Sequence, residues 1–125
     1  MFRLITQLLC VLILCLAAVV AHAQSIQLLM LERHDCPWCR AWHREIGPGY
    51  PHSDEGKRAP LRRVDLAEAW PADLPKLAAY YTPTFLLLVC NREIGRLVGY
   101  QGPDFFYPAL AQLLVPLKSE AASCG

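Results

Sequence analysis

The sequence predicts an α/β fold with a central four-stranded mixed sheet flanked by helices, in the order β-α-β-α-β-β-α. Three observations lead to this prediction. The apolar runs at 28–31 and 85–90 are short and unbroken, which is typical of strands buried on both faces. Apolar residues at helical spacing follow the first run and recur near the C-terminus. A short polar turn after residue 90 indicates an antiparallel hairpin.

Residues 1–23 have the pattern of a secretory signal peptide. Met1-Phe2-Arg3 gives a positively charged start, an apolar stretch follows from residue 8 to residue 20, and Ala21-His22-Ala23 ends in small residues. The prediction is cleavage after Ala23, and the alternative is a retained membrane anchor. Residues 24–125 then form a single domain, because about 100 residues are enough for one core.

Cleavage removes one charged residue, Arg3, so that 11 of the 12 basic residues remain beside 11 acidic ones. With neutral histidines the domain carries no net charge, and nothing in it indicates nucleic-acid binding. Cys10 and Cys15 leave with the signal peptide. The remaining thiols face a compartment that permits disulfides.

The first half of the domain predicts a strand, a helix and a connection. Residues 27–32 form a buried central strand. Pro37 opens a helix that runs through Trp42 and Ile46 and ends at Gly47-Pro48-Gly49. Residues 50–60 form a surface connection, in which Ser53 begins a short helical turn.

The second half predicts the rest of the sheet. We expect a short strand at 61–66, a helix at 72–81 with Pro75 in its first turn, and a strand at 85–90. Asn91-Arg92 turns the chain into a partner strand at 93–100. Pro108 kinks or delays the last helix, which is predicted to bury Phe105, Phe106, Ala109, Leu110, Leu113 and Leu114.

The motif Cys36-Pro37-Trp38-Cys39 indicates redox chemistry. With Cys36 at the N-cap and Pro37 at the first helical position, the helix N-terminus stabilises a thiolate at Cys36. Structural zinc is one alternative, although a second close pair of cysteines is absent and the histidines His34, His43 and His52 match no common spacing. A purely structural bridge is another, although so short a loop loses little entropy on closure.

Cys90 and Cys124 leave two possibilities open. The end of a strand and the C-terminal tail can meet in a second disulfide, or Cys124 can bond another molecule.

The chain resembles the thioredoxin-like superfamily over nearly all of residues 24–125. The resemblance lies in the dithiol after a buried strand, in Thr82-Pro83-Thr84-Phe85 before the next strand, and in the strand 93–100. It implies the thioredoxin fold, with Pro83 as a cis-proline facing the dithiol. Taken without the dithiol, Pro83 would be interpreted as an ordinary proline at a strand start.

The segments 32–48 and 59–65 resemble small periplasmic thioredoxin-like proteins called SoxS, which accompany bacterial sulfur-oxidation genes. The resemblance implies a periplasmic reductant of a sulfur-oxidation carrier protein, recharged by a membrane thiol transporter. One departure is Met30, which stands where cytoplasmic thioredoxins have a buried Asp. We interpret Glu32, two residues later, as a solvent-facing charge, and proton transfer to the dithiol is the alternative.

The predicted reaction is thiol–disulfide exchange. Cys36 attacks the substrate disulfide and Cys39 resolves the mixed disulfide, while Pro37 and Trp38 tune the pair. Thr82 and Pro83 hold the substrate strand.

Charged and polar residues lie next to the dithiol in the sequence. Arg40 adds positive charge or simply faces water, and His34 and Asp35 flank the nucleophile. We expect a monomer with no cofactor and no metal. The competing functions are a disulfide-forming oxidase or isomerase, and a metal-binding or partner-binding module that uses the same cysteines.

Overall fold

The computed structural model describes residues 1–2, 26–117 and 124, so the predicted signal peptide lies outside the described residues except for Met1 and Phe2. None of the helices in these ranges has the length and apolar character needed to cross a membrane. The elements are β1 (Ile26–Glu32), α2 (Pro37–Glu45), η1 (Tyr50–His52), α3 (Asp54–Arg58), β2 (Leu61–Asp65), β3 (Thr84–Val89), β4 (Arg92–Val98), α4 (Pro103–Leu114) and η2 (Val115–Leu117).

The predicted four-stranded mixed sheet is confirmed, with strand order β2-β1-β3-β4. The helices α2 and α3 form the crossover that lets β2 lie parallel to β1, whereas β3 pairs antiparallel with both β1 and β4. The hairpin turn lies at Cys90 and Asn91, one residue earlier than expected. Both residues have positive φ, 51° and 60°, as a two-residue hairpin turn with matching twist requires.

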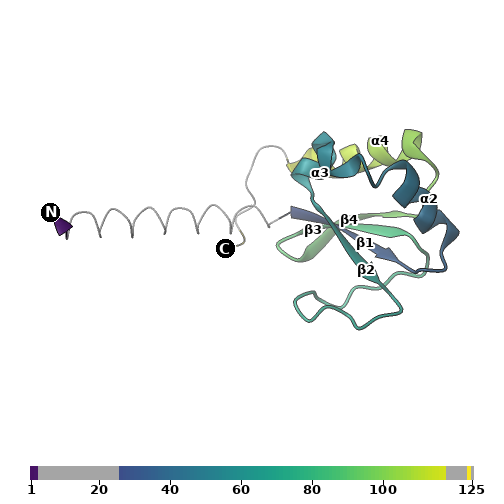
Figure 1. The fold of residues 1–125 in the computed structure, drawn as a ribbon, viewed down its shortest axis with the longest axis horizontal. Coiled ribbons are helices and arrows are strands. Elements are labelled where there is room, and N and C mark those ends of the chain that lie inside the picture. Colours follow the sequence, from purple (N-terminus) through teal and green to yellow (C-terminus); the bar gives the residue numbers. More distant parts are fainter. Residues whose placement is uncertain (3–25, 118–123, 125) are drawn as a thin grey trace.

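Alternation along the central strands divides the core into two layers. Leu28 and Met30 of β1 lie on the face that the helices cover, whereas Leu29 and Leu31 lie on the opposite face. Figure 1 shows α2, α3 and α4 gathered over one face of the sheet. On that face Trp42 of α2 packs against Phe106 of α4, with ring centroids 5.6 Å apart. This aromatic contact joins the buried side of α2 to α4.

The helix predicted at 72–81 is wrong. Residues 66–83 run as turns and irregular chain across the second face of the sheet, where Leu74 is buried against β1, β2 and β3. Pro75 and Pro83 disfavour helical geometry at the residue before each, Leu74 and Thr82, which leaves fewer than two turns for a helix. The apolar spacing that suggested a helix serves this packed loop instead.

Side-chain donors form hydrogen bonds with carbonyl groups of this loop that would bond to backbone N–H groups in a helix. Arg96 donates to the Ala78 carbonyl at 3.0 Å, and the indole of Trp70 donates to the Pro75 carbonyl at 3.1 Å. These hydrogen bonds come from residues outside the expected helix, so its sequence alone gave no sign of them.

The last helix is confirmed with two differences. It begins at Pro103, so Pro108 does not delay its start and lies inside the helix. Phe106, Leu110 and Leu114 are buried, whereas Phe105 is 63% exposed and the prediction of its burial is wrong. Pro103 starts the helix after Gly102, whose φ of 104° is accessible to glycine, and this places Phe105 on the outer side of the first turn.

Of the two possibilities for Cys90 and Cys124, the structure has the intramolecular disulfide, with Cα atoms 5.4 Å apart. The bridge joins Cys124 to the β3–β4 turn. Because Val89 pairs with Ile26 at the start of β1, this bridge lies at the end of the sheet opposite to the Cys36 loop.

Candidate active site

The loop after β1 places Cys36 at the N-cap of α2. Cys36 has extended backbone geometry, with φ −85° and ψ 110°, and Pro37 occupies the first turn. The backbone N–H of Cys39 donates to Cys36 Sγ at 3.1 Å. This is the arrangement predicted from the motif, and it directs the unpaired N–H groups of the helix N-terminus at the sulfur.

Cys36 and Cys39 form a disulfide with Cα atoms 5.3 Å apart. Cys36 is 6% exposed and Cys39 only 2%, so Cys36 is the slightly more accessible sulfur. Trp38, between them, is 63% exposed and adjoins a hollow that is also lined by Gly99, Tyr100 and Gln101. An exposed aromatic side chain and a hollow therefore lie next to the buried disulfide in the chain and on the surface of α2.

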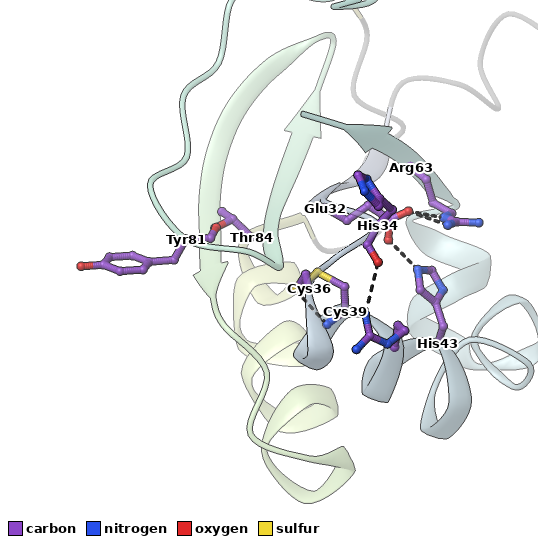
Figure 2. Close-up of a disulfide and its surroundings, with 9 residues drawn as sticks. Glu32, His34, Cys36, Cys39, His43, Arg63, Tyr81 and Thr84 are labelled. Atoms are coloured by element: carbon purple, nitrogen blue, oxygen red, sulfur yellow. Dashed lines mark hydrogen bonds and ion pairs between the residues drawn. A yellow bond between two sulfur atoms is a disulfide. The ribbon is translucent and has the colours of Figure 1, made fainter. Parts of the chain in front are cut away.

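The Thr82–Pro83 peptide bond is cis, as the resemblance implies. Leu31, near the end of β1, pairs with Thr84, so Pro83 lies at the same end of the sheet as the Cys36 loop. The Pro83 carbonyl accepts a hydrogen bond from Gly99 N–H at 2.7 Å, and Thr84 Oγ1 donates to the Tyr81 carbonyl at 2.6 Å. Figure 2 shows the Tyr81 side chain pointing away from the disulfide.

Glu32 is buried, which corrects its interpretation as a solvent-facing charge. Its side chain bridges two basic residues: His43 Nε2 lies 2.5 Å from Glu32 Oε2, and Arg63 Nε donates to Oε1 at 2.7 Å. Figure 2 shows this cluster beside the dithiol. Met30, the residue six positions before Cys36, is fully buried in the apolar core. Glu32 thus connects the end of β1 to α2 through His43 and to β2 through Arg63.

The side chain of Arg40 contacts the loop that precedes Cys36. Its backbone N–H donates to the Cys36 carbonyl at 3.2 Å, and its Nη1 donates to the His34 carbonyl at 3.2 Å. His34 and Asp35 are exposed on the same loop. Arg40 is therefore exposed to water and also hydrogen-bonded to the loop before Cys36.

Tyr100 is a site residue that the sequence analysis missed. It lines the hollow beside Trp38, and its hydroxyl donates to Glu45 Oε2 at 2.5 Å, which links the loop after β4 to the last turn of α2. Burial, together with the hydrogen bond to Glu45, raises the pKa of the Tyr100 phenol. The break Gly99-Tyr100-Gln101-Gly102 was visible in the sequence, but its position next to Trp38 depends on the tertiary fold.

Among the residues that the structure describes, no three or more His, Cys, Asp or Glu side chains gather in a group suited to a metal ion.

Neither a family model nor a curated protein matches the chain. Among solved structures, it is similar to the periplasmic thioredoxin SoxS from Paracoccus pantotrophus in its reduced form. The two are 43% identical over 71% of this chain and 95% of that chain, with a TM-score of 0.67. A thioredoxin from Malassezia sympodialis shares the fold at 18% identity, over 74% of this chain and 80% of that chain, with a TM-score of 0.52.

The sheet, the N-capped Cys36–Cys39 pair and these likenesses define a thioredoxin-like thiol–disulfide oxidoreductase. More narrowly, the chain belongs to the SoxS family of thioredoxins.

Proposed function

We propose that this protein is a periplasmic reductase that acts on a disulfide or mixed disulfide of a partner protein. The observation that carries the proposal is the Cys36–Cys39 pair at the start of α2, in a chain 43% identical to a periplasmic thioredoxin SoxS. By the same likeness, we propose a sulfur-oxidation carrier as the partner and a membrane thiol transporter as the electron donor.

In the proposed reaction, the Cys36 thiolate attacks one sulfur of the substrate disulfide and releases the other as a thiolate, which takes up a proton. Cys39 then loses its proton and attacks Cys36 Sγ. The Cys36–Cys39 disulfide forms, and the second substrate sulfur leaves as a thiolate. Two electrons pass to the substrate, and the donor dithiol returns two to the enzyme.

The surrounding residues support the exchange. Pro37 fixes the start of α2, and the helix N-terminus stabilises the Cys36 thiolate. Trp38 offers an exposed aromatic surface beside the dithiol. Thr82 and Pro83 precede β3 at the same end of the sheet, where their backbone is placed to hold an extended substrate segment.

The reduction potential of the Cys36–Cys39 pair tests the direction of the reaction. We expect a value near −270 mV, typical of a thioredoxin, from equilibration of residues 24–125 with glutathione or dithiothreitol buffers. A value near −120 mV would instead identify a disulfide-forming oxidase. Stoichiometric zinc or copper in protein purified without chelator would support the metal-binding alternative.

The proposal also includes export and a monomeric state. We expect the N-terminus of the periplasmic protein to be Gln24, because the pattern before it ends in Ala21-His22-Ala23. N-terminal sequencing of the exported protein checks the cleavage site, and sedimentation equilibrium checks the monomer. A retained N-terminus would favour the membrane-anchor alternative.

A further inference from the structure

The position of Arg40 relative to Cys36 is fixed at two points. Its backbone is hydrogen-bonded to the Cys36 carbonyl, one helical turn earlier, and its guanidinium is hydrogen-bonded to the His34 carbonyl, two residues before Cys36. Both acceptor carbonyls lie in the segment 34–36, which contains Cys36 and the loop before it. The guanidinium therefore remains at the edge of the site, although Arg40 is exposed.

The charge of Arg40 is not neutralised by a carboxylate in the described part of the chain, 26–117 with residues 1, 2 and 124. The other arginines near carboxylates differ in this respect, since Arg62 pairs with Asp73, Arg63 with Glu32, and Arg96 with Glu93. Arg40 is held by a carbonyl group, which orients the cation without cancelling it.

The other charges near Arg40 are Arg33 and Asp35, which are both exposed on the loop and have opposite signs, and Arg44, which is exposed one turn further along α2. Arg63 is paired with Glu32. A guanidinium has five N–H donors in a planar fork, and one donor group of Arg40 is directed to the His34 carbonyl. Donors therefore remain for a ligand at the edge of the site, with the geometry that a carboxylate prefers.

We propose that Arg40 is a specificity-determining residue, which selects a partner segment carrying a carboxylate next to the disulfide that Cys36 attacks. This inference rests on the proposed thiol–disulfide exchange. The exposed ring of Trp38 contacts the apolar part of the same segment, and Arg40 forms a charge-assisted hydrogen bond with its acidic residue. The preferred partner thus presents its cysteine in an acidic, partly apolar stretch.

A positive charge near Cys36 also stabilises its thiolate, which would change the rate with every substrate. A ratio of two rates separates the effects, because thiolate stabilisation cancels when one enzyme is tested on two substrates of opposite charge. The probes are two peptide disulfides of equal length that differ only in Glu or Lys on both sides of each cysteine.

The experiment measures the second-order rate constants of reduced residues 24–125 with both peptides. We expect the Glu peptide to react faster, and Arg40→Gln to lower the Glu-to-Lys ratio by about three- to eight-fold at low ionic strength. Arg40→Lys should keep most of the ratio, Arg40→Glu should invert it, and added salt should move every ratio toward one.

Arg44→Gln is the matched control, because Arg44 is an exposed residue of the same helix and its removal changes the net charge equally. A ratio that is unchanged by Arg40→Gln, or lowered as much by Arg44→Gln, would overturn the assignment while both peptides are still reduced. Failure of the unmodified protein to reduce either peptide would overturn the proposed function and this inference together.

Discussion

At the scale of single residues, the site depends on polar contacts that fix α2 against the sheet. Glu32 binds His43 of α2 and Arg63 of β2 from its buried position at the end of β1. Tyr100 binds Glu45, two residues after His43 in the last turn of α2. The last turn of the helix that follows Cys36 is therefore held by β1 through His43 and by the loop after β4 through Glu45.

We expect Glu32→Gln to lower the free energy of unfolding by about 1–2 kcal/mol, because it leaves two basic side chains without their buried partner. The magnitude is below the roughly 3–5 kcal/mol typical of fully buried pairs, since the Arg63 side chain is 59% exposed. Urea unfolding measures the change. Glu93→Gln, which breaks an ion pair with a more exposed carboxylate, is the control and should cost less than about 1 kcal/mol. Equal costs would contradict the central role given to Glu32.

The Tyr100 phenol leads to a prediction for alkaline pH. Its pKa is raised in the folded protein, so its contribution to stability is complete below the pKa of about 10 in the unfolded chain. That contribution is lost as the pH rises above 10 toward the folded pKa. Between pH 9 and 11, Tyr100→Phe should lose less stability than the unmodified protein. Parallel loss in both proteins, followed by denaturant midpoints, would refute this assignment.

The burial of Glu32 could not be predicted from the sequence around it. Its two partners lie 11 and 31 residues further along the chain, and only the packing of α2 and β2 brings them to the strand end. The N-cap at Cys36 could be predicted, because helix capping is determined by neighbouring residues.

At the scale of elements, apolar patterns and turn residues in the sequence predicted β1, α2 and the β3–β4 hairpin. The same kind of pattern predicted a helix at 72–81 that the structure does not contain. Apolar spacing is common to helices and to packed loops, and the prolines at 75 and 83 favour the loop in this segment. The burial of Leu74 on the second face of the sheet is a tertiary contact, which periodicity does not reveal.

We expect Leu74→Ala to destabilise the protein by about 2–4 kcal/mol, because this side chain fills the layer between the loop and the sheet. Leu77→Ala, in the same loop but only partly buried, is the control and should cost less. Chemical denaturation measures both. The far-UV circular dichroism of Leu74→Ala should be unchanged, and a loss of helical signal would contradict the irregular structure of this segment.

At the scale of the whole molecule, two disulfides lie at opposite ends of one sheet. Cys36 follows the end of β1, whereas Cys90 follows the strand end that pairs with the start of β1. A strand of this length spans about 20 Å, so the two pairs do not exchange directly within one molecule. The bridge from Cys90 to Cys124 closes a long loop that includes β4 and α4.

We expect the double substitution Cys90→Ser and Cys124→Ser to lower stability by about 3–4 kcal/mol, as loop-closure entropy predicts for a sequence separation of 34. The reduction potential of Cys36–Cys39 should stay the same. Thermal melting and redox equilibration of the double variant measure the two effects. A shift in the potential would show that the bridges are coupled.

The four-stranded mixed sheet could be predicted because the resemblance to thioredoxins combined the dithiol, Pro83 and the last strand into one architecture. What the resemblance did not supply was the surface around Cys36. The contact from Arg40 to the His34 carbonyl and the hollow beside Trp38 depend on side-chain positions that element order does not determine.

Trapping of a mixed disulfide tests most directly the claim that Cys36 is the attacking sulfur and Cys39 the resolving one. Cys39→Ser, expressed from Met1, should hold a partner protein on Cys36 through a bond that reductant releases, as non-reducing gels and mass spectrometry would show. Cys36→Ser should hold none. Capture by Cys36→Ser, with none by Cys39→Ser, would contradict the account.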